Sequence, residues 1–310
     1  MYPPPNPVTA EPFARLPDRY RARDSSRWGS INFAGHALTS FLEGPSFDRA
    51  GRLHVVDIPF GRIFRINHDG DWDVVVEYDG WPNGLKIHPD GRLFVADYRR
   101  GILVVDPDTG AIKTLLDGYR CEGFKGCNDL FFAPDGTLYF TDQGQTGLQD
   151  PTGRVYAWSD EQGLRRLIDT VPSPNGLVLN GNGTQLLVAA TRGNAVWRLP
   201  LMDDGGASKV GIFVQLSGGL AGPDGLALDS EGGLLVCHVG IGVWRFDARG
   251  RPTHLVEAPE GSLWTNLAFG PDGYSLFITD SASGTVMRAR MPVPGRPMAS
   301  HGPICQKSTA

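Results

Sequence analysis

The sequence of 310 residues has few cysteines, no long hydrophobic run and no excess of positive charge, and each absence excludes a class of protein. Its four cysteines have no regular spacing, so they form neither a disulfide framework nor a zinc motif. Cys121 and Cys127 could pair across a short loop, but free thiols in a reducing compartment are the simpler interpretation. No apolar stretch approaches the roughly 18 residues of a membrane-spanning helix.

The charge pattern and the first residues narrow the setting further. A net charge of -5 without a basic block argues against nucleic acid and anionic membranes as partners. The start, Met1-Tyr2-Pro3-Pro4-Pro5, has neither a basic region nor an apolar core, so we expect no secretory signal. These features predict a cytoplasmic protein, monomeric or homodimeric, that acts on a small molecule rather than on nucleic acid or membranes.

Glycine and proline, in contrast, are abundant (41 and 24 residues), and they punctuate a unit that recurs along the chain. The clearest copy is Pro-Asn-Gly-Leu-Val-Leu at 174–179, followed by Gly183 and the apolar run 186–188. The leading polar residues of the copies are spaced by 40, 45, 47, 49 and 42 residues and are Glu43, Asn83, Asn128, Asn175, Asp224 and Asn266. A period of this size with several short strands predicts a β-propeller, here all-β with six blades.

Three copies contain the same turn, Pro-Asp-Gly, at 89–91, 134–136 and 271–273. Proline presets φ, aspartate bonds back to the backbone and glycine takes the left-handed position that closes a short hairpin. Together with the alternating runs that follow, the turn predicts four antiparallel strands in each blade.

The repeat also sets the expected boundaries. Residues 1–30 lack sustained periodicity and are predicted to form an N-terminal arm, 31–295 the propeller and 296–310 a C-terminal tail. Blade 6 has only three strands in line, because the prolines at 292 and 294 cannot continue a ladder. We therefore expect an N-terminal strand, residues 36–42, to supply the fourth strand and close the ring.

Two segments of blade 3, residues 119–127 and 143–152, exceed the blade plan. Loops added to a regular scaffold are where function is usually placed.

The leading residues suggest a site of their own. The first strand of every propeller blade lines the central channel, so these six side chains should form a ring at one mouth. All six carry oxygen donors, which suits a divalent cation such as Ca²⁺. The alternative is that asparagine and aspartate before glycine cap turns. Glu43 is a poor turn residue in the same place, so the pattern favours metal binding by the ring over turn capping.

Four motifs resemble those of a known family, the SMP-30/gluconolactonase/luciferin-regenerating-enzyme family. They are Glu43-Gly44-Pro45, Cys127-Asn128-Asp129-Leu130, Pro174-Asn175-Gly176-Leu177 and Gly222-Pro223-Asp224-Gly225-Leu226, and the resemblance covers about residues 35–292. It implies a six-bladed propeller that binds one divalent cation, Ca²⁺ foremost, with Zn²⁺, Mn²⁺, Mg²⁺ or Fe²⁺ as alternatives. It also implies a hydrolase that opens small, sugar-derived lactones.

By the same resemblance, Glu43, Asn175 and Asp224 would be direct metal ligands, and Asn128 a fourth ligand or a substrate contact. Members often carry an arginine two residues before this asparagine, where the present chain has Gly126. Lactone hydrolysis needs a polarised carbonyl, an attacking water and a group that takes its proton. Asp224 is the catalytic candidate, as ligand and general base; the alternative is that it only coordinates.

Other residues are weaker candidates for substrate binding. Asn83 and Asn266 belong to the ring. His238 ends a second strand where four other blades have aspartate, so it is either hydrogen-bonded inside the blade or a substrate contact. Arg192 is either a solvated loop residue or an anion clamp. A Ser-His-Asp triad is unsupported, since the chain has no Gly-x-Ser-x-Gly elbow.

Three functions therefore stay open at this point. The first is a metal-dependent lactonase, the second a phosphotriesterase-like hydrolase with the same metal site, and the third a non-catalytic propeller that binds a partner. The oxygen-rich ring argues against the third, because a purely structural channel could be filled with apolar side chains.

Overall fold

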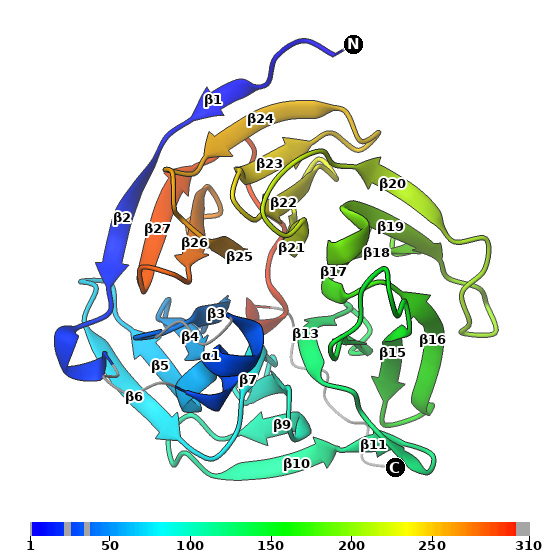
Figure 1. Cartoon of the computed structure of the whole chain (residues 1–310), viewed down its shortest axis with the longest axis horizontal. Coiled ribbons are helices and arrows are strands. Elements are labelled where there is room, and N and C mark those ends of the chain that lie inside the picture. The colour runs from blue at the N-terminus through cyan, green and yellow to red at the C-terminus, as the bar shows by residue number, and fades with distance from the viewer. Residues whose placement is uncertain (1, 22–25, 34–37, 302–310) are drawn as a thin grey trace.

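Six four-stranded antiparallel sheets surround a central channel in the computed structural model, which describes residues 2–21, 26–33 and 38–301 (Figure 1). This architecture confirms the prediction of a six-bladed propeller. The inner strand of each blade lines the channel, and the other strands follow outward as a meander, except that the outermost strand of blade 6 comes from the N-terminal region.

The strands of the blades, from the channel outward, are as follows. Blade 1 comprises β3 (Leu42–Phe47), β4 (Leu53–Asp57), β5 (Arg62–Ile66) and β6 (Trp72–Glu77), and blade 2 comprises β7 (Pro82–Ile87), β8 (Leu93–Asp97), β9 (Gly101–Val105) and β10 (Ile112–Leu116). Blade 3 comprises β13 (Cys127–Phe132), β14 (Leu138–Asp142), β15 (Gly153–Ser159) and β16 (Gly163–Val171), and blade 4 comprises β17 (Pro174–Leu179), β18 (Gln185–Ala190), β19 (Ala195–Pro200) and β20 (Gly211–Gln215). Blade 5 comprises β21 (Pro223–Leu228), β22 (Leu234–His238), β23 (Gly242–Phe246) and β24 (Pro252–Glu257), and blade 6 comprises β25 (Trp264–Phe269), β26 (Ser275–Asp280), β27 (Thr285–Arg290) and β2 (Ala10–Arg15).

Few elements lie outside the blades. β1 (Asn6–Val8) adds a parallel fifth strand to blade 5, and β11 (Gly118–Tyr119) pairs with β12 (Glu122–Gly123) in the long loop before blade 3. The helix α1 (Arg27–Asn32) packs on the short 3-10 turn η2 (Ile58–Phe60), through Trp28 against Ile58 and Phe41.

The strand that closes the ring is β2, so the expectation that residues 36–42 close it is wrong. β2 pairs with β27 from Ala10, opposite Ala289, to Arg15, opposite Thr285. Residues 38–41 form no strand, Leu42 already begins β3, and residues 36 and 37 lie outside the described part of the chain. The N-terminal origin of the closing strand is confirmed, but it lies within the segment predicted to be a surface arm.

β2 was hard to recognise because it is an edge strand. Its sequence, Ala-Glu-Pro-Phe-Ala-Arg, contains a proline and two charges, which a strand tolerates when one edge faces solvent. Only Ala14 and the following Leu16 are deeply buried, at 6% and 2% exposure. They join an apolar cluster with residues of blades 1 and 6 such as Phe64 and Val286.

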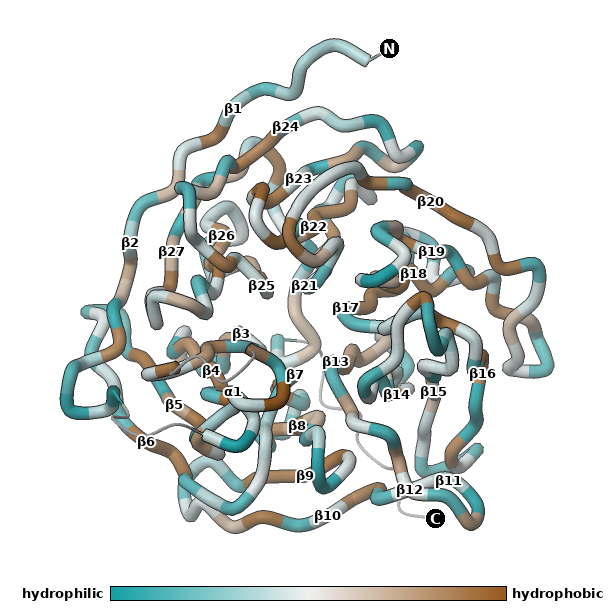
Figure 2. Tube along the Cα trace, viewed as in Figure 1, coloured by the Kyte–Doolittle hydropathy of each residue, from teal (hydrophilic) through white to brown (hydrophobic). Residues whose placement is uncertain are grey.

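The apolar side chains gather between neighbouring blades rather than in one central core. One cluster joins blades 5 and 6 and includes Leu235 and Leu267. Another joins blades 4 and 5 and includes Leu187, Ala189 and Leu226. The outer strand β10 combines hydrophobic and hydrophilic residues, and none of its residues is fully buried, as expected at the rim of a blade (Figure 2). Each blade therefore depends on both neighbours for burial.

The aspartates that end the second strands anchor the starts of the inner strands. In three blades the carboxylate accepts a hydrogen bond from the backbone N–H that directly precedes the inner strand, namely Phe41 to Asp57 (2.7 Å), Gly126 to Asp142 (2.8 Å) and Leu263 to Asp280 (3.1 Å). These aspartates therefore have a structural role within their blades. It also fixes the mouth of the channel at which the predicted ring lies.

The C-terminal segment crosses the opposite mouth. Arg296 donates its backbone N–H to Leu228, the last residue of β21, and the Ser300 hydroxyl donates to the carbonyl of Phe47, the last residue of β3. Residues 296–301, predicted as part of a tail, thus bind the far ends of two inner strands. A ligand has its open approach from the mouth where the inner strands begin.

Two smaller expectations can be compared with the structure. Cys121 is exposed and Cys127 is buried, and both are free thiols. Within the described residues, no helix has the length and apolar character needed to cross a membrane.

Candidate metal centre and substrate pocket

A β-bulge aims the predicted ring residues into the channel. In every inner strand the register with the second strand shifts next to the second residue, for example between Pro174 and Leu177 in blade 4. Bulges bend a strand and re-aim its side chains. In blades 1 to 5 the second residue is a member of the predicted ring, namely Glu43, Asn83, Asn128, Asn175 and Asp224.

Blade 6 departs from this register. Its inner strand begins at Trp264, so the second residue is Thr265, and Asn266 is the third. The residue that matches Asn266 in blade 3 is Asp129, which the sequence analysis quoted within a motif but gave no role. The prediction that Asn266 belongs to the ring is therefore wrong by one residue, and Thr265 occupies the ring position. The turn motif after Asn266 has one residue more than its counterpart in blade 3, which shifted the comparison of the two blades.

Asn266 and Asp129 meet in the channel next to Glu43. The Asn266 amide nitrogen lies 2.8 Å from a Glu43 carboxylate oxygen and 3.3 Å from a carboxylate oxygen of Asp129. The amide oxygen of Asn266 accepts the backbone N–H of Leu267 at 2.8 Å. Asn266 is 2% exposed and holds two carboxylates in place; it does not line the pocket described below.

Glycine at the third position of the other inner strands leaves room for these side chains. A Cβ at Gly84 would lie 2.6 Å from a carboxylate oxygen of Asp129, and one at Gly225 would lie 2.4 Å from the amide oxygen of Asn266. Real Cβ atoms do not approach so closely, so the narrow channel admits the two longer side chains only because glycine faces them.

The carboxylates of Glu43, Asp129 and Asp224 thus share the channel, and burial together with mutual repulsion raises the pKa values of Glu43 and Asp224. Burial raises the pKa of Glu43 to about 7, and the charge of Asp129 contributes, while hydrogen bonds from Thr265, the Gly44 backbone and Asn266 oppose the rise. Lys86 is the nearby counter-charge, with its ammonium 3.9 Å from the Asp129 carboxylate.

Asp224 is in the same situation. Enclosure by protein raises its pKa well above the usual range, and the negative charges of Glu43 and Asp129 raise it further. The positive charge of Arg192 and a hydrogen bond from Asn175 oppose the rise. Asp224 keeps part of its surface accessible to solvent, although protein atoms pack around its carboxylate.

The donor set fits a divalent cation. Carboxylate and amide oxygens are the ligands that hard cations prefer, and a cation would relieve the repulsion between Glu43 and Asp224. The amide oxygen of Asn128 is buried and accepts no hydrogen bond from the described residues. His, Cys, Asp and Glu side chains alone form no cluster of three suited to a metal in this part of the chain, so asparagine oxygens must complete the set.

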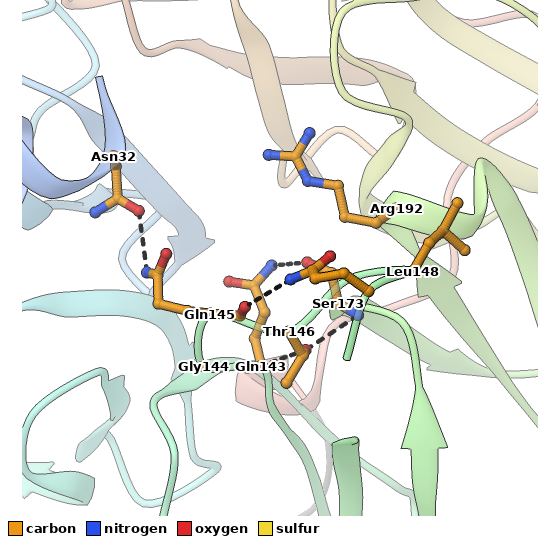
Figure 3. A pocket seen from close by; sticks show the side chains of 9 residues that line it. Asn32, Gln143, Gly144, Gln145, Thr146, Leu148, Ser173 and Arg192 are labelled. Carbon is orange, nitrogen blue, oxygen red and sulfur yellow. Dashed lines mark hydrogen bonds between the residues drawn. The ribbon is translucent and has the colours of Figure 1, made fainter. Parts of the chain in front are cut away.

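A pocket of about 430 Å³ lies at the same mouth (Figure 3). Its wall comes from the long loop of blade 3, from α1, from the start of blade 4 and from the 3-10 turn η3 (Thr191–Gly193). Most of its side chains are neutral and polar, namely Asn32, Gln143, Gln145, Thr146, Gln149 and Ser173. Gly144, Leu148 and Arg192 complete the lining.

A chain of hydrogen bonds connects this pocket to the ring. Asn128 donates to Gln143 at 2.9 Å, and Gln143 donates to the Ser173 hydroxyl at 2.9 Å. The Thr146 hydroxyl donates to the Gln143 carbonyl at 2.6 Å and accepts the Ser173 backbone N–H at 3.2 Å. Gln143 and Ser173 were not predicted from the sequence, in which the length of the 143–152 loop is the signal for a role of this segment.

Ser173 carries backbone strain at this point. Its φ is 62°, in the left-handed region that non-glycine residues rarely occupy. Ser173 directly precedes β17 and is 4% exposed. The strained turn holds its hydroxyl under Gln143 while Asn175, two residues later, faces the channel.

Tyr98 occupies the space beside Asn128 that Gly126 leaves open. Gly126 has a φ of 153°, and a Cβ there would lie 2.6 Å from the Tyr98 ring. The Tyr98 hydroxyl accepts a hydrogen bond from Gln145 at 2.9 Å. Where the family resemblance implies an arginine, this chain packs an aromatic ring against the wall of the pocket.

The remaining predicted residues lie in three different places: His238 in blade 5, Asn83 in the ring and Arg192 at the pocket. His238 is 1% exposed, with Nε2 3.1 Å from the Gly218 carbonyl and Nδ1 accepting from Trp244 Nε1 at 3.3 Å. Both nitrogens are engaged inside blade 5, and His238 does not line the pocket. Asn83 lies in the ring at 8% exposure, and Arg192 lines the pocket.

A six-bladed propeller whose channel is lined by carboxylate and amide oxygens under a polar pocket defines a class of channel-site propeller proteins. Within it, the chain belongs to the family described as SMP-30/Gluconolactonase/LRE-like region, whose model matches residues 41–282. The family predicted from the four motifs is thereby confirmed.

Individual relatives agree with this assignment. A gluconolactonase of Zymomonas mobilis is 33% identical over 225 residues, which is 67% of this chain and 62% of that protein. The lactonase drp35 of Staphylococcus aureus is 31% identical over 256 residues, 76% of this chain and 77% of that one. Among solved structures, the gluconolactonase XC5397 of Xanthomonas campestris has a TM-score of 0.73 at 24% identity, covering 94% of this chain and 98% of its own, which supports the fold.

Proposed function

We propose that the protein is a lactonase that opens a small, sugar-derived lactone with the help of one divalent cation, Ca²⁺ foremost, in the channel. The observation that carries the proposal is the gathering of the Glu43, Asp129 and Asp224 carboxylates below a polar pocket. The gluconolactonase and lactonase named above support the reaction class.

Glu43, Asn175 and Asp224 would hold the cation, with Asn128 as a fourth ligand or a substrate contact. When bound, the cation supplies polarisation of the lactone carbonyl and stabilisation of negative charge on its oxygen. Asn266 and the Gly44 backbone keep the Glu43 carboxylate oriented, each by a hydrogen bond of 2.8 Å.

Asp224 takes the proton of the attacking water in this proposal. The water oxygen adds to the carbonyl carbon, the ring C–O bond breaks and the product is the open hydroxy acid. Without a cation, burial and the charges of Glu43 and Asp129 raise the pKa of Asp224; a bound cation would oppose that rise and keep the carboxylate ionised, as a general base requires.

Substrate contacts are proposed for Asn128 and Arg192, which border the pocket or its floor. Asn83 is kept as a candidate because it shares the ring. For Asn266 and His238 the hydrogen bonds described above favour supporting roles, toward Glu43 and within blade 5 respectively.

The test is hydrolysis of a lactone panel, followed with a pH indicator, on protein stripped with a chelator and then resupplied with Ca²⁺, Mn²⁺, Zn²⁺ or Mg²⁺. We expect turnover of aldonolactones that disappears on chelation and returns with metal. Full activity after verified metal removal would contradict the metal-dependent mechanism. The same protein is tested on diethyl 4-nitrophenyl phosphate, and a clear preference for this phosphotriester would replace the lactonase proposal with the phosphotriesterase one.

A further inference from the structure

Arg192 is the one charged side chain among the residues that line the pocket, and its charge reaches Asp224, but its guanidinium makes no hydrogen bond within the described part of the chain. Figure 3 shows the side chain extending over the pocket from the side opposite Asn32 and Gln145. The other polar groups of the wall are amides and hydroxyls. A solvated arginine would be unremarkable on an outer strand, but this one faces a cavity above the channel.

The backbone under Arg192 is firmly held. Its N–H donates to the Pro172 carbonyl at 3.3 Å, and the preceding Thr191 donates its N–H to Ser173 at 3.0 Å and its hydroxyl to the Pro223 carbonyl at 2.7 Å. Thr191 is 5% exposed. The guanidinium is therefore carried on a turn pinned to the starts of blades 4 and 5, which are the strands that bear Asn175 and Asp224.

The amides of the facing wall are already used for mutual bonds. Gln143 bonds Asn128 and Ser173, while Gln145 donates to Tyr98 at 2.9 Å and accepts at its backbone carbonyl from Gln149 at 3.4 Å. These bonds hold the wall without any contribution from Arg192. The guanidinium is left with its donors directed into the cavity.

The charges around the channel determine the sign of the net charge at the pocket. A bound divalent cation and Lys86 would together offset the charges of Glu43, Asp129 and Asp224, so that Arg192 would leave the mouth of the channel with a net positive charge. Arg192 is exposed to the cavity, and guanidinium forms its strongest pairs with planar carboxylates, which it can bind through two parallel hydrogen bonds.

From these contacts, and resting on the lactonase function proposed above, we infer that the substrate is a lactone that also carries an ionised carboxylate, which Arg192 binds while the lactone carbonyl lies over the channel. The distal carboxylate distinguishes this substrate class from neutral aldonolactones.

The test compares two lactones that share a ring and differ in one group. D-Glucaro-1,4-lactone has a carboxylate where D-glucono-1,4-lactone has a hydroxymethyl group. Hydrolysis by the metal-loaded protein is followed in a pH-stat, and binding of each lactone and of its open acid is measured by calorimetry. Wild type, R192Q, R192K and the control R198Q are compared; Arg198 is an exposed arginine on β19 of the same blade, outside the pocket.

We expect wild type to bind and turn over the carboxylated lactone preferentially. R192Q should raise its KM and weaken its binding roughly 10- to 100-fold, as expected for the loss of charge-assisted hydrogen bonds, and change the neutral lactone less than about threefold. R192K should be intermediate because it keeps the charge but loses the bidentate geometry. R198Q should match wild type, and the preference should shrink as salt rises.

The inference is overturned if wild type binds the neutral lactone at least as well, or if R192Q weakens both lactones equally. The binding measurement decides this whether or not turnover occurs. Absence of hydrolysis of every lactone together with selective binding of the carboxylated one would instead reject the lactonase function and leave the anion site standing.

Discussion

The seam between the first and last blades can be tested by removing one side chain, that of Leu16. This residue directly follows the closing strand β2, is 2% exposed and packs in the cluster shared by blades 1 and 6. Replacing a leucine of this kind by alanine removes buried methyl groups and leaves a cavity. The cost is typically 2–5 kcal/mol, and we expect about 3 kcal/mol for L16A.

The matched control is Leu38, which lies in the segment first expected to close the ring. It is only partly buried and belongs to no strand, so L38A should cost about 1 kcal/mol. Urea unfolding gives both free energies, and a thermal scan should show L16A melting at least roughly 5 °C below wild type. If L38A destabilised the protein as much as L16A or more, the closure through β2 would be refuted.

The other predictions concern the site and the pH response. With saturating metal, the turnover of D224N should stay at least about 10²-fold below that of wild type, because Asp224 is the proposed general base. E43Q should largely recover its activity. A titration of activity with metal that restored both variants equally would show that Asp224 is only a ligand. S173G and S173A should raise KM alike by loosening Gln143, and S173G should be the more stable by about 1 kcal/mol in urea unfolding, because glycine accepts a φ of 62° without strain. A common loss of stability without any change in KM would assign Ser173 a purely structural role. Burial lowers the pKa of His54 to about 4, so the unfolded chain binds a proton at this histidine more readily than the folded protein does. The free energy of unfolding should therefore be highest above about pH 6.5 and fall by up to about 3 kcal/mol as the pH drops toward 4. H54Q should show a flatter dependence of unfolding free energy over the same interval, and an unchanged slope would refute this origin.

Much of the fold could be read from the sequence because the propeller repeats its local signals. The three Pro-Asp-Gly turns at 89–91, 134–136 and 271–273 lie, as predicted, between the first and second strands of blades 2, 3 and 6. These signals are local, since a hairpin depends on its own turn residues. The closing strand is different. Its partner is about 275 residues away, and nothing in its own sequence specifies that pairing.

The site shows the same division. Glu43, Asn175 and Asp224 could be proposed from their repeated position, because the repeat itself encodes which side chains face the channel. Asp129 was not predicted as a channel residue because a bulge shifts the register of β13 by one residue. A shift of one residue changes the direction in which a side chain points. Gln143 and Ser173 act through contacts between a loop and another blade, which spacing along the chain does not reveal.

In the proposed mechanism the channel carboxylates and amides bind one divalent cation on which lactone hydrolysis depends. Calorimetric titration of Ca²⁺ into chelator-treated protein, with lactone hydrolysis recorded on the same samples, measures both the binding and the dependence. We predict one ion bound per chain, activity that rises in step with occupancy, and markedly weaker binding by E43Q. Absence of saturable binding by every divalent ion tried, with lactonase activity intact in chelator, would contradict the claim.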